Sequence, residues 1–228
     1  DFIEVDEDTR INVKLKSGQE TEINAPGPKV TQEQFQALIT QIKNTTSEDT
    51  VIVAGSVPNS IPSDAYAQIA QITEKTGAQL VVDAEKDLVE TVLPYRPLFI
   101  KPNKDELEVM FNTTVKSDED VIKYGKEILK KGAQSVIISL GGDGAIYVDQ
   151  HQSIKAVNPQ GHVVNTVGSG DSTVAGMVAG LSMGLNVDEA FQQAVASGTA
   201  TAFSEDLATR DAIENIKSQV TISVLDGE

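Results

Sequence analysis

The sequence predicts an α/β fold in which helices cover a mainly parallel central sheet and a small β hairpin stands apart. Apolar strands alternate with amphipathic helices through the middle of the chain, and the residues after Gly170 are mostly helical. Residues 9–25 alternate between apolar and polar side chains, as a hairpin does. The chain has 228 residues, of which 39% are hydrophobic, enough for one sizeable core. We therefore expect a single domain over residues 1–228.

The middle of the chain predicts repeated strand–helix–strand units. Residues 50–55 are typical of a buried strand, and residues 63–77 predict an amphipathic helix that Ser63 can cap and Gly77 can end. Further strands are expected at 78–84, 97–102 and 134–142, and further helices at 87–93, 103–111 and 118–131. This order is typical of a parallel sheet covered on both faces.

Both ends of the chain depart from that order. Antiparallel strands are expected at 145–150 and 153–158, followed by helices at 170–184, 188–204 and 209–219. In the hairpin at 9–25, Ile11 lies on the apolar face and Arg10 on a polar, cationic face, with a turn at 16–19. Periodicity alone leaves open whether this hairpin is a solvated surface feature or part of a site.

Charge and composition exclude several classes of function. The formal net charge of −16 argues against nucleic acid or an anionic membrane as a partner. The chain has no cysteine, which excludes disulfides, zinc–thiolate sites and thiol catalysis. No apolar run approaches the roughly 20 residues of a membrane span. With no signal peptide at its start, the sequence favours a cytoplasmic protein.

The stretch "NTVGSGDSTVAGMV", residues 165–178, carries the main candidate for chemistry. Glycines ahead of a helix let backbone N–H groups converge on one point, and the helix N-terminus favours an anion there. Asp171 has two interpretations, a helix cap or a general base beside a phosphate. No Lys-Ser/Thr pair follows, so this is not a Walker A loop. Small residues in this helix are expected to let it pack closely on the sheet, namely Ala175, Gly176, Ala179 and Gly180.

Two further motifs lie at predicted strand ends. In "KPNKDELE" the pair Asn103 and Glu106 is either a capping pair or a polar pair that holds hydrated Mg²⁺. "SLGGDG", residues 139–144, is either a tight turn or a glycine loop that lets a nucleotide approach the backbone. Ligands of parallel sheets bind at the carboxyl ends of the strands, so the motifs together favour a site.

These motifs resemble those of the ribokinase-like, PfkB-type sugar kinases, over essentially the whole chain. The stretch at 165–178 is similar to the C-terminal signature of the family, "NKDE" to its N-x-x-E motif and "SLGGDGA" to its nucleotide-binding loop. "TRINVKL" and "AGSVPNSIP" resemble the branch that acts on phosphorylated ketohexoses, closest to 1-phosphofructokinase. The resemblance implies a ribokinase-like three-layer sandwich with residues 9–25 as part of a lid over the sugar.

The resemblance also implies roles for individual residues. Asp171 is expected to be the catalytic base, with an anion hole formed by the amides of Gly168, Ser169 and Gly170. ATP is expected to contact Ser139, Gly141, Gly142 and Gly144. Mg²⁺ is expected to be supported through water by Asn103 and Glu106, with no direct protein ligand, and the existing phosphate of the sugar to be bound by Arg10 and Ser56. A homodimer through the lid fits the resemblance.

The expected activity is ATP-dependent phosphorylation of a ketohexose phosphate, fructose 1-phosphate to fructose 1,6-bisphosphate. The alternatives are a tagatose-6-phosphate kinase and a non-catalytic protein that binds nucleotide or sugar phosphate on the same fold. Family members begin with a segment that has no counterpart ahead of Asp1, so the chain is expected to hold most of the ATP site and part of the sugar site.

Overall fold

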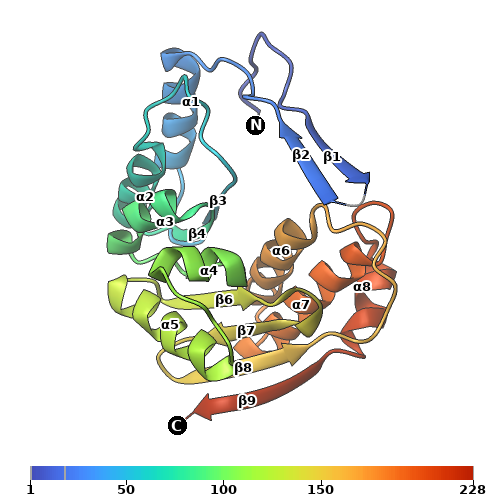
Figure 1. The fold of residues 1–228 in the computed structure, drawn as a ribbon. Coiled ribbons are helices and arrows are strands. Elements are labelled where there is room, and N and C mark those ends of the chain that lie inside the picture. The colour runs from blue at the N-terminus through green and yellow to red at the C-terminus, as the bar shows by residue number, and fades with distance from the viewer. Residues whose placement is uncertain (1, 18, 228) are drawn as a thin grey trace.

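The computed structural model describes residues 2–17 and 19–227, and its larger sheet has seven strands in the order β3-β4-β5-β6-β7-β8-β9 (Figure 1). The strands are β3 (Thr50–Ala54), β4 (Gln79–Asp83), β5 (Phe99–Ile100), β6 (Ser135–Ser139), β7 (Ala145–Val148), β8 (Gln152–Val157) and β9 (Thr221–Gly227). Pairing is parallel from β3 to β6 and antiparallel from β6 to β9. Because β8 therefore runs in the direction of β3 to β6, the sheet is mainly parallel, as predicted.

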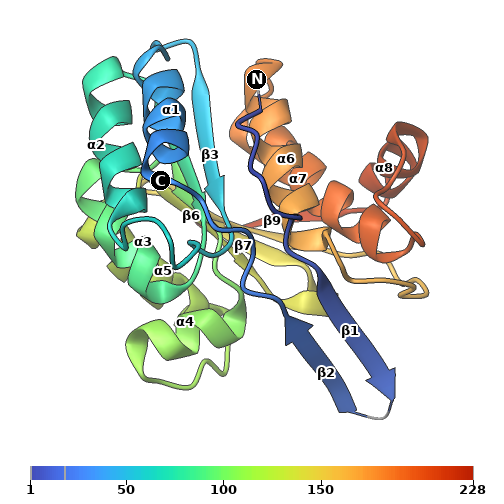
Figure 2. The ribbon, with the colours of Figure 1, turned by 90° about the horizontal axis from the view of Figure 1, so that it is seen from above.

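Helices cover both faces of this sheet (Figure 2). One face carries α1 (Gln32–Lys43), α2 (Ala65–Thr76), α3 (Lys86–Val92), α4 (Lys104–Phe111) and α5 (Asp118–Lys131). The other face carries α6 (Ser169–Ser182), α7 (Val187–Ala202) and α8 (Arg210–Lys217). In the part of the chain that the structure describes, no helix combines the length and the apolar character needed to cross a bilayer.

Alternation along the strands divides the core into two layers. Val136 and Ile138 of β6 belong to the layer beneath α1–α5, whereas Ile137 between them belongs to the layer beneath α6–α8. All three side chains are fully buried. A strand points successive side chains to opposite faces, so an uninterrupted apolar run such as β6 requires cover on both sides. The predicted three-layer α/β architecture is confirmed.

Two elements, α1 and β9, lie in segments for which the sequence pattern above predicts no element. Helix α1 begins at a capping box in which Thr31 and Gln34 each accept a hydrogen bond from the backbone N–H of the other, and it buries Phe35 and Ile39. Strand β9 pairs with β8 at the edge of the sheet. Its outward side chains are largely exposed, so it lacks the apolar run that marks the interior strands.

Two details of the prediction for residues 50–77 are wrong. Strand β3 is an edge strand and not a buried one, and Ile52 at its centre is 45% exposed. Asp64, not Ser63, is the N-cap of α2, and it makes no side-chain capping bond. The predicted end of α2 is confirmed, because Gly77 takes the left-handed conformation with φ 81°.

A two-stranded hairpin, β1 (Asn12–Ser17) and β2 (Gln19–Asn24), forms the second sheet. Figures 1 and 2 both show it projecting away from the seven-stranded sheet. The predicted hairpin is confirmed, although its turn at 16–19 includes Gly18, which lies outside the described residues. The side chains of Lys14 and Lys16 also lie outside them.

Close contact between α6 and α7 fixes the position of α6. A Cβ atom on Gly176 would lie 2.9 Å from the Cα of Ala194, and one on Gly180 would lie 2.9 Å from the Cα of Ala190. The prediction that these glycines face the sheet is therefore wrong, because they pack against α7. Only glycine permits this approach, so the N-terminus of α6 has a defined place beside α7.

Candidate active site

The carboxyl ends of four neighbouring parallel strands bring polar side chains to one edge of the sheet. Ser56 lies shortly after β3, Asp83 ends β4, Lys101 follows β5 and Ser139 ends β6. A bridge between Asn103 and Ser139 extends the parallel pairing of β5 and β6 at this edge. Ligands of open α/β sheets bind outside the carboxyl ends of the strands, which makes this edge the candidate site.

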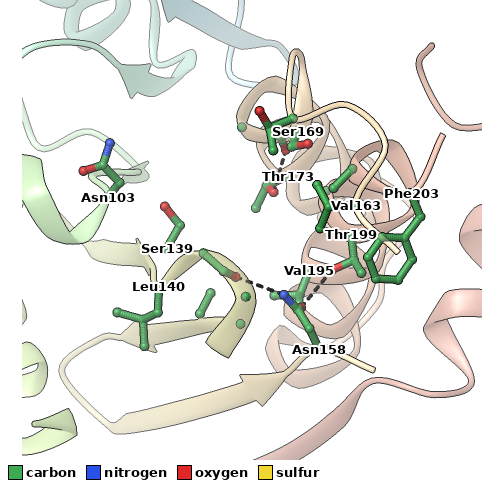
Figure 3. Close-up of a pocket in the computed structure, with 18 of the residues that line it drawn as sticks. Asn103, Ser139, Leu140, Asn158, Val163, Ser169, Thr173, Val195, Thr199 and Phe203 are labelled. Carbon is green, nitrogen blue, oxygen red and sulfur yellow. Dashed lines mark hydrogen bonds between the residues drawn. The ribbon is translucent and has the colours of Figure 1, made fainter. Parts of the chain in front are cut away.

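A pocket of about 620 Å³ opens at this edge (Figure 3). Its walls come from the loop after β6, the start of α4, the first residues of α6 and one side of α7. The predicted site residues that line it are Asn103, Ser139, Gly141, Gly142, Gly144, Ser169 and Gly170. Glu106 lines a smaller neighbouring pocket of about 360 Å³. The structure therefore brings most of the predicted nucleotide residues around one cavity of the size that small ligands occupy.

The start of α6 decides between the two interpretations of Asp171. Gly168, with φ 80°, is the N-cap, and no side-chain bond caps this helix. Asp171 lies in the first turn, is exposed, and is not the cap. The capping interpretation is wrong, which leaves the carboxylate available for other chemistry. The Ser169 amide, predicted to help bind an anion, donates to the carbonyl of Thr166 at 3.2 Å, so a phosphate there has to displace that bond.

The glycine loop after β6 is held by residues that the sequence analysis did not single out. Gly141 and Gly144 both have positive φ, at 61° and 94°. The Asn158 side chain donates to the carbonyl of Gly141 at 3.1 Å and accepts from the Thr199 hydroxyl at 2.8 Å (Figure 3). Asn158 thus joins this loop to α7 across the pocket. No local pattern around Asn158 indicates this role, because its partners lie far along the chain.

Substitution of Gly144 tests how tightly the loop is built. A Cβ atom there would lie 1.9 Å from the carbonyl oxygen of Ala156, at a φ that side chains other than glycine avoid. We expect Gly144→Ala to lower the free energy of unfolding by roughly 2–6 kcal/mol, since strain and overpacking each cost about 1–3 kcal/mol. Gly142 is the matched control, because a Cβ there meets nothing within 4 Å. Equal urea midpoints for the two alanine variants would contradict this account.

Asn103 and Glu106 form a reciprocal capping box at the start of α4. The Asn103 side chain accepts from the Glu106 amide at 2.8 Å, and the Glu106 carboxylate accepts from the Asn103 amide at 2.7 Å. The capping interpretation of the pair is confirmed. Both residues also border the pockets, so a role toward Mg²⁺ stays a prediction.

Arg10 and Ser56, both predicted to bind the phosphate of the sugar, are in contact. The Arg10 guanidinium donates to the Ser56 hydroxyl at 2.6 Å, although the two residues are 46 positions apart. Both are exposed, so an incoming ligand can reach them. The contact joins the segment just before the hairpin to the loop after β3. It thereby places the positively charged guanidinium of Arg10 at the edge of the sheet.

The structure also reveals a buried ion pair that the sequence analysis missed. The ammonium of Lys101 lies 3.2 Å from the carboxylate of Asp83, with the side chains 8% and 18% exposed. Burial raises the pKa of Asp83, the charge of Lys101 opposes that rise, and the carboxylates of Glu106 and Asp171 add to it. The sequence signal that could have indicated this ion pair is a lysine directly after an apolar strand. The carboxylate partner is set by strand pairing, which local sequence does not show.

Comparisons with known proteins agree with this architecture. A model of the pfkB family of carbohydrate kinases matches residues 1–212. The chain is 42% identical over 224 residues to the 1-phosphofructokinase of Bacillus subtilis, covering 98% of this chain and 74% of the relative. It is 35% identical to the D-tagatose-1-phosphate kinase of Bacillus licheniformis, covering 99% of this chain and 74% of the relative.

A solved structure gives the same result for the fold. A crystal structure from Staphylococcus aureus, named "putative phosphofructokinase", superposes with a TM-score of 0.91 at 82% identity, covering 100% of this chain and 74% of that chain. The family match spans the strand ends, the glycine loop and the start of α6 described above. The chain belongs to the pfkB family of carbohydrate kinases.

Proposed function

We propose that this protein transfers the γ-phosphoryl group of ATP to the 6-hydroxyl of fructose 1-phosphate, giving fructose 1,6-bisphosphate and ADP. The observation that carries the proposal is the position of Asp171. Its exposed carboxylate lies in the first turn of α6, directly after Ser169 and Gly170, which both line the pocket. Membership of a carbohydrate kinase family and the 42% identity to a 1-phosphofructokinase support it.

In this reaction Asp171 acts as the general base. It takes the proton from the acceptor hydroxyl as that oxygen forms its bond to the γ-phosphorus, and the bond to the bridging oxygen breaks with its electron pair leaving on ADP. The amides of Gly168, Ser169 and Gly170, together with the helix N-terminus, stabilise the charge on the transferring group. Asp171 thus accepts the proton next to the backbone amides that stabilise the phosphoryl group, all at the start of α6.

ATP occupies the larger pocket against Ser139, Gly141, Gly142 and Gly144. Absence of side chains at the glycines lets the phosphates approach the backbone. Mg²⁺ would neutralise phosphate charge, and Asn103 and Glu106 would hold it through water, because this ion prefers oxygen ligands and keeps several waters. Among the described residues no three His, Cys, Asp or Glu side chains group as a metal cage. In this proposal the phosphates of ATP would carry most of the contacts to the ion.

The existing phosphate of the sugar binds Arg10 and Ser56. Arginine offers a planar fork to a phosphate, and Ser56 holds that fork in place. We also propose that residues 9–25 act as the lid of a single catalytic domain over residues 1–228. Exposed apolar side chains on the hairpin, among them Val13 and Ile23, fit a homodimer formed through that lid.

A panel of sugar phosphates tests the proposal. Purified protein with ATP and Mg²⁺ is assayed on fructose 1-phosphate, fructose 6-phosphate, tagatose 6-phosphate and tagatose 1-phosphate, with ADP release as the readout. We expect the highest kcat/KM with fructose 1-phosphate. A preference for either tagatose phosphate would favour the alternative kinase. Nucleotide binding without turnover on any sugar would fit either the non-catalytic alternative or a chain that holds only part of the sugar site.

A further inference from the structure

The turn that presents Ser56 begins at Gly55, the residue directly after β3. Gly55 has φ 80°, and a Cβ atom built on it would meet nothing within 4 Å. The side of Gly55 on which a side chain would lie is therefore open space, and packing there does not hold the turn. Because glycine has the most conformational freedom to lose on folding, a fixed position for Ser56 depends on hydrogen bonds to the Gly55 backbone.

Two hydrogen bonds hold Gly55, one through its N–H and one through its carbonyl. The N–H donates to the carbonyl of Asp83 at 3.0 Å, which continues the parallel pairing of β3 with β4. The carbonyl accepts from the Tyr66 hydroxyl at 2.8 Å. The first bond belongs to the sheet, whereas the second comes from a side chain on α2.

The Tyr66 hydroxyl is kept as a donor by its surroundings. Tyr66 lies in the first turn of α2, is 6% exposed and belongs to the core layer beneath α1–α5. Burial raises the pKa of its hydroxyl to about 12, and the negative charge of Asp83 adds to the rise. The proton therefore stays on the oxygen near neutral pH. Phenylalanine would fill the same space in the core, so packing alone does not explain the hydroxyl.

These contacts form a series that ends at the sheet edge. The Tyr66 hydroxyl fixes the carbonyl of Gly55, the next residue is Ser56, and the Ser56 hydroxyl accepts from the Arg10 guanidinium at 2.6 Å. We propose that Tyr66 is a positioning residue for the sugar phosphate, which fixes the turn at Gly55 so that Ser56 and Arg10 are aligned before the ligand arrives. The inference rests on the proposed function, in which Arg10 and Ser56 bind that phosphate.

Tyr66→Phe tests this role, because it removes the hydroxyl and keeps the ring. We expect the dissociation constant for fructose 1-phosphate, measured by titration calorimetry, to rise by about 3- to 10-fold, the usual effect of losing one neutral hydrogen bond. In steady-state kinetics the KM for sugar phosphate should rise by a similar factor, while kcat and the KM for ATP stay within about twofold. In a Ser56→Ala background the same change should weaken binding little further, since Tyr66 acts through Ser56.

Tyr124→Phe is the matched control. Tyr124 lies on α5, packs against the same core layer, and makes a hydrogen bond of 3.0 Å with the Thr113 hydroxyl. Both variants should lose similar stability in thermal melting, but only Tyr66→Phe should bind fructose 1-phosphate more weakly. A lower melting temperature for Tyr66→Phe with an unchanged dissociation constant would overturn the inference, because the hydroxyl would then serve stability alone.

The titration reads binding without turnover, so it separates this inference from the kinase function. A parent protein that binds fructose 1-phosphate but transfers no phosphoryl group counts against the kinase function, and weaker binding by Tyr66→Phe would still support the role of Tyr66. An active parent whose Tyr66→Phe variant binds as tightly contradicts only that role. A parent that binds no sugar phosphate overturns the inference, since Tyr66 would then have no phosphate site to position.

Discussion

Asp171→Asn is expected to lower kcat by about 10²- to 10⁴-fold, the usual contribution of a general base. Asparagine keeps the size and polarity of the side chain but cannot accept the proton of the acceptor hydroxyl. ATP affinity should be retained, because the glycine loop and the amides of Gly168 and Gly170 are unchanged. Steady-state kinetics with fructose 1-phosphate and a binding titration with ATP measure the two quantities separately.

Stability should change little in this variant. Asp171 makes no capping bond, so only its interaction with the helix dipole is lost, worth about 0.3–1 kcal/mol at an exposed site. Asp211→Asn is the matched control, since Asp211 is also an exposed first-turn aspartate, in α8, and should lose a similar amount of stability with no loss of kcat. A kcat for Asp171→Asn within about threefold of the parent would remove Asp171 from the role of base.

The local sequence pattern predicts those helices and strands whose conformation is determined by their own side chains. Helix α5 has the predicted bounds, because Ser117 caps it, acidic residues fill its first turn and lysines its last. Helix α1 carried an equally readable signal, the spacing of Thr31 and Gln34 ahead of apolar residues three and four apart. Strand β3 shows what the sequence pattern cannot predict. Its apolar run indicates a strand, but its place at the edge of the sheet depends on which strands pair.

The site divides in the same way. The glycine loop and the start of α6 are contiguous in sequence, so their motifs could be found before the structure. Whether Asp171 caps its helix depends on which residue takes the left-handed conformation, and Gly168 and Gly170 are equally able to do so. The pair of Asp83 and Lys101 depends on the register between β4 and β5, which no local pattern encodes.

Arg10→Ala is expected to raise the KM for sugar phosphate by roughly 10- to 100-fold, the range given by the 1.5–3 kcal/mol of a hydrogen bond to a charged group. The sequence has only three arginines, and Arg10 is the one held at the edge of the sheet by Ser56. The KM for ATP should change little, because Arg10 does not line the nucleotide pocket. Initial rates over a grid of both substrates separate the two effects.

Two further variants show whether Ser56 acts through Arg10. Ser56→Ala frees the guanidinium to swing, so the KM for sugar phosphate should rise less than in Arg10→Ala, and the double variant should be no worse than Arg10→Ala alone. Arg210→Ala is the matched control for loss of an exposed arginine, since Arg210 lies at the start of α8. If Arg10→Ala leaves the KM for sugar phosphate unchanged, the contact with Ser56 only anchors the hairpin, and the phosphate of the sugar binds elsewhere.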